Sequence, residues 1–174
     1  TGGTGDVGTP YAEGEQAYFE YLETKGGVEG LNLVLTGKDY AYSIPEAQKI
    51  YQELRDKEKA AAILGWGTGD TEALRQQVAT DQLPFFSASY SESLKNTKES
   101  PYNFLIAASY SDQGRAVLKW IKENHEGDSP TVALLYNDTA FGRSPIEDIK
   151  AYGKEIGVEV VDEQVIDVQA TEAQ

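Results

Sequence analysis

Residues 60–71 are Ala60-Ala61-Ala62-Ile63-Leu64-Gly65-Trp66-Gly67-Thr68-Gly69-Asp70-Thr71, a short apolar run followed by a glycine-rich loop and the start of a helical pattern. This order is typical of a strand-to-helix turn in an open α/β sheet, where ligands collect at the carboxyl ends of the strands. Loop amides and the positive end of the next helix both face outward at such a turn. We therefore expect a ligand-facing turn here.

The next predicted strand ends in a similar loop, in which hydroxyl groups replace the glycines: Leu83-Pro84-Phe85-Phe86-Ser87-Ala88-Ser89-Tyr90-Ser91. The carboxyl ends of parallel strands gather at one edge of a sheet. Two such loops can therefore face one small polar molecule.

The rest of the chain alternates between short apolar runs and segments of helical periodicity, which indicates consecutive strand–helix units. Helices are predicted over residues 11–24, 70–80 and 111–124, and after two capping-box patterns, Ser43-Ile44-Pro45-Glu46 and Ser144-Pro145-Ile146-Glu147. Strands are predicted over residues 31–35, 61–64, 84–87, 104–108, 131–136 (buried along its whole length) and 158–161, continuing toward Ile166. The predicted fold class is α/β, with parallel-sheet, three-layer lobes.

A polar stretch at residues 93–101 separates two series of strand–helix units, and we place a lobe boundary there. Residues 1–100 are predicted to form a first α/β lobe without its first strand. Residues 101–174 start a second lobe, with a hinge strand near residues 100–108, and they hold too few strands to complete a normal sheet. The chain opens in a predicted loop at residues 1–5 and has no methionine, so we expect a fragment or a processed chain whose signal peptide was removed.

The chain is strongly acidic, with a formal net charge of -14. A nucleic-acid surface needs clustered basic residues to neutralise phosphates, so no nucleic-acid partner is expected. No apolar run approaches the ~20 residues of a spanning helix, so no direct membrane insertion is expected. There is no cysteine to act as a nucleophile or a metal ligand, and the single histidine, His125, falls at a predicted helix end.

The sequence shows no catalytic constellation, because no nucleophile has a credible base and the carboxylates are scattered. We therefore predict no enzyme activity, no metal site and no cofactor. Gly3-Thr4-Gly5-Asp6-Val7-Gly8 has the letters of the dinucleotide fingerprint but lacks the strand that should precede it. A Rossmann-like enzyme remains an alternative that would need such a strand and measurable dinucleotide affinity.

The predicted binding residues of the first loop are Trp66, Thr68, Gly69, Asp70 and Thr71. Adjacent glycines allow a ligand to approach the backbone closely. An α-amino acid would suit this loop, with its carboxylate on amides and hydroxyls and its ammonium near a carboxylate. The alternative is structural: Asp70 only caps the helix and the glycines only turn the chain.

The remaining predicted binding residues are Ser89, Tyr90 and Ser91 in the second loop and Phe141 in the loop at residues 136–142. The hydroxyl residues either contact a ligand or satisfy their own backbone in a turn. Phe141 would cover an apolar ligand from the second lobe.

Several short motifs, in this order and spacing, resemble the leucine/isoleucine/valine-binding proteins. The motifs are Asp6-Val7-Gly8, Lys25-Gly26-Gly27-Val28-Glu29-Gly30, Ala62-Ile63-Leu64-Gly65, Ser87-Ala88-Ser89, Pro101-Tyr102-Asn103-Phe104, Ser111-Asp112-Gln113-Gly114 and Phe141-Gly142. Members of this family are extracytoplasmic solute-binding subunits of ABC transporters, in which two α/β lobes close on the ligand. The resemblance covers nearly the whole chain.

The resemblance implies a small-molecule solute, an amino acid or amide, and an ABC transporter permease as partners. It implies a periplasmic or other extracytoplasmic location, either free or lipid-anchored. The Gly65–Thr71 loop differs from the serine-rich loop of the aliphatic amino-acid binders, so amides, urea and aromatic acids remain alternative ligands. A ligand-sensing receptor domain of the same fold is the alternative function.

Overall fold

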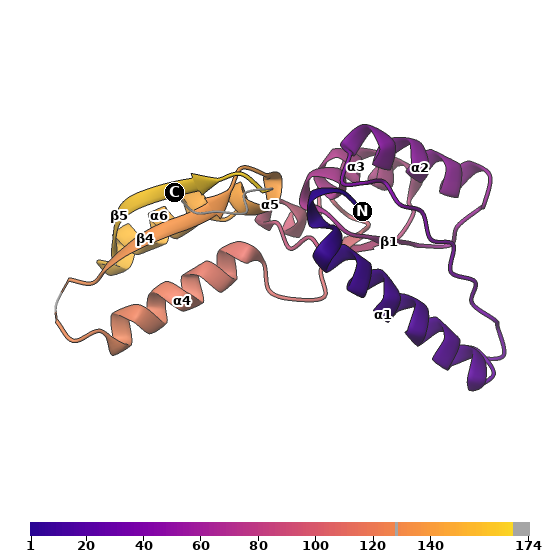
Figure 1. Ribbon diagram of the computed structural model, residues 1–174, viewed down its shortest axis with the longest axis horizontal. Helices are drawn as coiled ribbons and strands as arrows, with labels where there is room; N and C mark the ends of the chain where they lie inside the picture. Colours follow the sequence, from indigo (N-terminus) through magenta and orange to yellow (C-terminus); the bar gives the residue numbers. More distant parts are fainter. Residues whose placement is uncertain (128, 169–174) are drawn as a thin grey trace. The chain divides into compact units, whose positions relative to one another are not determined.

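The computed structural model describes residues 1–127 and 129–168 (Figure 1). The chain divides into two compact units, Thr1–Lys57 and Glu58–Gln174. The predicted lobe boundary near residue 100 lies within the second unit and stays a prediction. Among the described residues, the first unit contains only helices, and the second unit contains helices and all the strands.

The first unit contains a short 3-10 helix, η1 (Gly2–Thr4), and the helices α1 (Gly5–Thr24) and α2 (Ile44–Asp56). The predicted N-terminal loop is wrong, because η1 and α1 occupy it. The predicted helix start at Tyr11 is also wrong, because α1 begins at Gly5 and continues through Pro10.

Helix α2 confirms the prediction that a helix follows Ser43, and its Ala47 and Tyr51 side chains are buried. Ser43 is the N-cap residue, but its side chain makes no capping hydrogen bond. The predicted capping box therefore does not form, and the proline in the first helical turn remains the local signal for the helix start.

The strand predicted at residues 31–35 is wrong. Leu31 forms one isolated antiparallel bridge with Val28, and no ladder continues from it among the described residues. Val34 is 85% exposed. Apolar alternation favours a strand, but a strand also needs a neighbouring backbone to accept and donate its hydrogen bonds.

A three-stranded parallel sheet begins the second unit, in the order β1 (Ile63–Gly65), β2 (Phe85–Ser87) and β3 (Asn103–Phe104). Helix α3 (Thr68–Asp81) connects β1 to β2, and the 3-10 helix η2 (Glu92–Lys95) lies between β2 and β3. Leu74, Val78 and Phe85 form the buried centre of this region. The strand predicted at residues 104–108 is wrong in extent, because β3 ends at Phe104. The hinge near residues 100–108 stays a prediction.

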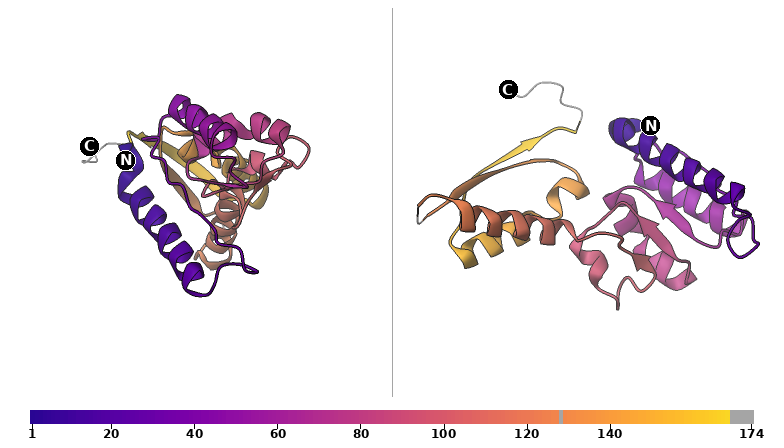
Figure 2. Two further views of the ribbon diagram at one scale, coloured as in Figure 1. Left: turned by 90° about the vertical axis from the view of Figure 1, so that its right-hand side faces the viewer. Right: turned by 90° about the horizontal axis from the view of Figure 1, so that it is seen from below.

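A second parallel sheet pairs β4 (Thr131–Asn137) with β5 (Glu159–Ile166). Helix α4 (Tyr110–Asn124) precedes β4, and the helices α5 (Ala140–Arg143) and α6 (Ile146–Ile156) lie between the two strands. Figure 2 shows α4 and α6 on the same side of this sheet. Helix α6 begins after Pro145, and no side-chain capping bond forms there either.

Glycine allows α4 and α6 to approach each other closely. A Cβ atom added at Gly114 would lie 2.4 Å from Cγ1 of Ile149, well inside van der Waals contact.

The prediction that β4 is buried along its whole length is wrong. Its residues are exposed or half-buried, and Leu135 is 69% exposed. The second face of this two-stranded sheet has no helix over it among the second unit's described residues.

The parallel α/β class is confirmed by both sheets. Each pair of neighbouring parallel strands has its connection outside the sheet, and α3 and α6 supply two of these connections. Within residues 1–127 and 129–168, none of the helices is long and apolar enough to cross a membrane.

Candidate ligand-binding site

The two predicted loops lie side by side at the carboxyl ends of β1 and β2. These strands are parallel neighbours with Gly65 opposite Ser87, so both chains leave the sheet at the same edge. Just beyond, the Ala88 amide donates to the Gly65 carbonyl oxygen at 3.4 Å. The Ser89 hydroxyl donates to the Thr68 hydroxyl at 3.0 Å, which joins the two loops through their side chains.

Close packing against β2 requires a glycine at Gly65, the last residue of β1. A Cβ atom at Gly65 would lie 2.4 Å from the nearest ring carbon of Phe85 and 3.2 Å from the Ser87 Cβ. The buried Phe85 ring therefore occupies the space that any larger residue would need. This close approach of β1 and β2 is what brings Thr68 and Ser89 within hydrogen-bond distance.

Helix α3 starts two residues earlier than predicted, with Gly67 as its N-cap residue. The prediction that Asp70 caps the helix is wrong: Asp70 lies inside the first turn, where a negative charge is favoured by the helix dipole. The Thr71 hydroxyl donates to the Gly67 carbonyl at 2.5 Å. The first N–H groups of an α-helix have no carbonyl one turn back, so those of Thr68 and Gly69 are oriented out of the helix end.

The serine loop is held mainly by contacts within the protein. The Ser89 amide donates to the Ser87 hydroxyl at 3.0 Å. The Ser91 hydroxyl donates to Glu72 at 2.5 Å and lies 3.1 Å from the Ser144 hydroxyl, which donates to it. With its hydroxyl engaged in this way, Ser91 would contact a ligand through its backbone.

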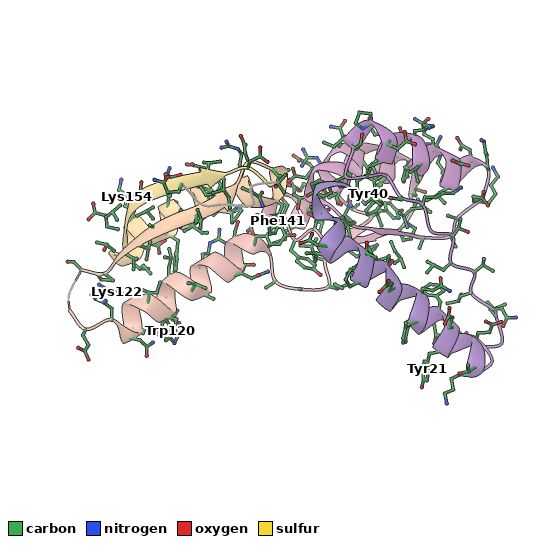
Figure 3. All side chains as sticks on the ribbon, viewed as in Figure 1. Tyr21, Tyr40, Trp120, Lys122, Phe141 and Lys154 are labelled. Carbon is green, nitrogen blue, oxygen red and sulfur yellow. The ribbon has the colours of Figure 1, made fainter. Side chains whose placement is uncertain are left out.

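Three aromatic rings, from Tyr90, Tyr110 and Phe141, form what we call the aromatic cluster. The Tyr90 and Tyr110 ring centroids are 5.7 Å apart, and those of Tyr110 and Phe141 are 5.0 Å apart in an edge-to-face arrangement. Burial, with a smaller contribution from Tyr110, raises the pKa of the Tyr90 hydroxyl. Phe141 belongs to the short helix α5 and not to a loop as predicted; it is 45% exposed and is labelled in Figure 3.

Sequence analysis missed Tyr110. It is the first residue of α4, and the sequence-visible signal is only that Ser109 before it is a good N-cap residue. Its hydroxyl donates to the Ala88 carbonyl at 2.9 Å, and its amide donates to the Tyr90 carbonyl at 2.8 Å.

Trp66, a predicted binding residue of the first loop, is half-buried in the turn before α3.

A cluster of charges fixes the start of α4 near the serine loop. Lys95 lies 2.9 Å from Glu92 and 2.8 Å from Asp112, and Arg115 lies 2.8 Å from Asp112. The Lys95 hydrogen bond, with others from Ser109 and Arg115, lowers the pKa of Asp112 to about 2. Burial would raise the pKa of Glu92, but the bonds from Ser109 and Lys95 outweigh it and lower that pKa.

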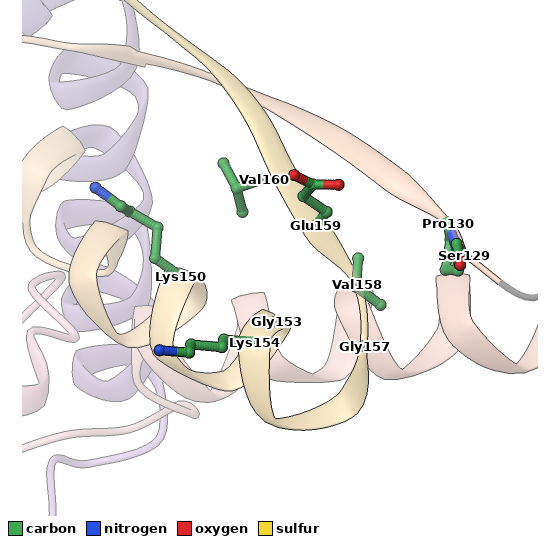
Figure 4. Close-up of a pocket in the computed structure, with 9 residues that line it drawn as sticks. All are labelled: Ser129, Pro130, Lys150, Gly153, Lys154, Gly157, Val158, Glu159 and Val160. Carbon is green, nitrogen blue, oxygen red and sulfur yellow. The ribbon is translucent and has the colours of Figure 1, made fainter.

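A separate hollow of about 420 Å³ lies at the amino ends of β4 and β5 (Figure 4). Its wall includes Lys150, Lys154 and Glu159 but none of the predicted binding residues. Lys150 is already 2.8 Å from Glu163. Phe141 follows the opposite, carboxyl end of β4, so this hollow is not the site described above. Among the described residues, no group of three or more metal-binding side chains could hold an ion.

The two loops lie at the carboxyl edge of a parallel sheet, which is where open α/β proteins bind their ligands. The sequence profile of the periplasmic binding protein family matches residues 1–174. The chain belongs to this family. The family and the structural neighbours are solute-binding proteins and not enzymes.

Solved structures support the same assignment. A branched-chain amino acid ABC transporter protein from Thermus thermophilus, with bound valine, is 30% identical over 95% of this chain and 43% of that one, with a TM-score of 0.89. An ABC transporter substrate-binding protein from Aeropyrum pernix is 37% identical. The match covers 98% of this chain and 44% of that one, with a TM-score of 0.87.

A solute-binding protein of an ABC transporter from Rhodopseudomonas palustris BisB5, in complex with 3,4-dihydroxybenzoic acid, has the same fold, with a TM-score of 0.78. It is 23% identical, and the match covers 96% of this chain and 45% of that one. The chain thus spans less than half the length of these structures. No curated protein matches the chain significantly.

Proposed function

We propose that the chain is part of the solute-binding subunit of an ABC transporter and captures a branched-chain or other hydrophobic amino acid between two lobes. The family assignment supports the general role. The bound valine of the Thermus thermophilus protein, at 30% identity, supports the solute class. Closure of the lobes about a hinge near residues 100–108 would present the form that the permease recognises.

The observation that carries the proposal is the hydrogen bond between Ser89 and Thr68 at the start of α3. This bond joins the loop after β2 to the first turn of α3, and the helix dipole favours an anion at the Thr68 and Gly69 amides of that turn. The carboxylate of an amino acid is such an anion and accepts several hydrogen bonds at once. Asp70, in the same helical turn, would attract the ammonium group.

The aromatic cluster supports an apolar side chain on the solute. Phe141 is 45% exposed beside Tyr110, so part of its ring is available to an apolar group. Burying such a group stabilises the complex by about 25 cal/mol per Å² of apolar surface. The partner would be a transporter permease, and the location extracytoplasmic, with or without a lipid anchor.

Thermal unfolding with single solutes tests the proposal. We expect L-valine, L-leucine or L-isoleucine at ~100 times its dissociation constant to stabilise the folded chain by about 2.7 kcal/mol. Thr68→Val should reduce this effect, whereas the matched change Thr80→Val, at an exposed position of the same helix, should not. Stabilisation by an amide, urea or an aromatic acid alone would overturn the assigned solute class, and no stabilisation by any solute would overturn the function.

A further inference from the structure

Tyr110 occupies an unusual position in the aromatic cluster because it is bound to the serine loop at two points. Its hydroxyl donates to the Ala88 carbonyl at 2.9 Å. Its amide donates to the Tyr90 carbonyl at 2.8 Å. The first amides of a helix lack a partner within the helix, so the second bond satisfies a group that α4 itself leaves open. Tyr110 therefore joins the start of α4 to the backbone on both sides of Ser89.

The same side chain also contacts the short helix that follows β4. The Tyr110 and Phe141 rings meet edge to face, with their planes at 86°. Phe141 lies on a helix of only four residues, which has few backbone bonds of its own to hold the ring. Tyr110 also contacts the Tyr90 ring, with the two ring planes at 61°. Its ring thus contacts both other members of the aromatic cluster.

The start of α4 is held in place by several hydrogen bonds and ion pairs. Ser109 accepts the Asp112 amide at 3.1 Å and donates to Glu92. Lys95 lies 2.8 Å from Asp112, which ties the same turn to η2. Because Tyr110 follows Ser109 directly, these bonds help to fix its backbone position, in addition to its own amide bond to the Tyr90 carbonyl.

We propose that Tyr110 is a positioning residue that sets the solute specificity of the site. This inference rests on the proposed function. In it, the hydroxyl and the ring of Tyr110 have different roles. The hydroxyl holds the loop at Ala88 and Ser89, which faces the part common to all amino acids. The ring supports Phe141, which faces the variable side chain of the solute. Nothing requires Tyr110 itself to touch the solute.

Two substitutions separate these roles. Tyr110→Phe keeps the ring and removes the bond to Ala88, so it should weaken the binding of L-leucine and L-alanine by the same factor, about twofold to tenfold. Tyr110→Leu removes the ring contact with Phe141 as well. It should lower the preference for L-leucine over L-alanine about fivefold, in line with the typical strength of an edge-to-face pair.

The matched control is Tyr152→Leu, which removes a half-buried tyrosine of α6 outside the aromatic cluster. A purely structural effect would lower the melting temperature of both leucine variants without changing the ratio of the two dissociation constants. The inference therefore predicts a changed ratio in Tyr110→Leu alone. An unchanged ratio in Tyr110→Leu, or an equal change in Tyr152→Leu, overturns it.

Amide hydrogen exchange without solute tests the positioning role independently. Tyr110→Leu should speed exchange at residues 88–91 and 140–143, and Tyr110→Phe at residues 88–91 only. If the unmodified protein binds no amino acid, the proposed function fails, and the exchange pattern then decides whether Tyr110 holds these two segments. Unchanged exchange in both segments overturns the positioning role.

Discussion

Replacing Ser89 by alanine removes the hydroxyl that joins the loop after β2 to the start of α3. Ser89 is 1% exposed and Thr68 is 2% exposed, so water cannot replace the lost partner without a rearrangement. A buried hydroxyl left without its partner costs about 1–3 kcal/mol. For a chain of this size, about 2 kcal/mol corresponds to a decrease of roughly 4–8 °C in the melting temperature.

A double-mutant cycle with Thr68→Val isolates the bond itself. When both hydroxyls are absent, neither is left unsatisfied, so the double variant should be less destabilised than the sum of the single variants by about 1 kcal/mol. Urea unfolding of the four proteins measures this coupling. Ser129→Ala, at an exposed serine outside the loops after β1 and β2, is the control and should stay within about 0.5 kcal/mol of the original. Strictly additive losses would refute the role assigned to the pair.

Two further predictions concern the scaffold. Gly114→Ala should destabilise the fold by about 1–3 kcal/mol in urea unfolding, because the new methyl group meets Ile149; Gly14→Ala, with open space around it, should instead gain up to about 1 kcal/mol of helix stability. Since the pKa of Asp112 is lowered from 3.8 to about 2, it contributes stability that is present above pH ~4 and lost between pH ~4 and ~2. Asp112→Asn should flatten the pH dependence of unfolding in that window, and an unchanged slope would contradict the ion pairing described.

The sequence allowed the parallel α/β class and the boundaries of several elements to be predicted, because these depend on local patterns. Helix α2 could be predicted from its proline and its apolar periodicity, and β4 and β5 from their apolar runs. The two loops could be placed at one edge of a sheet because parallel strands impose that arrangement. Their assignment as a binding site stays a prediction.

Features that depend on distant partners could not be predicted. The apolar residues 31–35 have the pattern of a strand but no ladder beside them among the described residues. The commitment of Ser91 to Glu72 and Ser144, and the place of Tyr110 between Tyr90 and Phe141, depend on tertiary contacts that no local pattern reports. The short helix α5 is too brief to produce a periodic signal.

The central claim is that an amino acid binds at the loops after β1 and β2. A titration of the isotopically labelled chain with L-valine or L-leucine, followed by amide chemical shifts, tests it most directly. The account predicts saturable changes at the amides of residues 67–71 and 88–91, with smaller changes at residues 140–143. Saturable changes confined to the hollow around Lys154 and Glu159, or no saturable change with any amino acid, would contradict it.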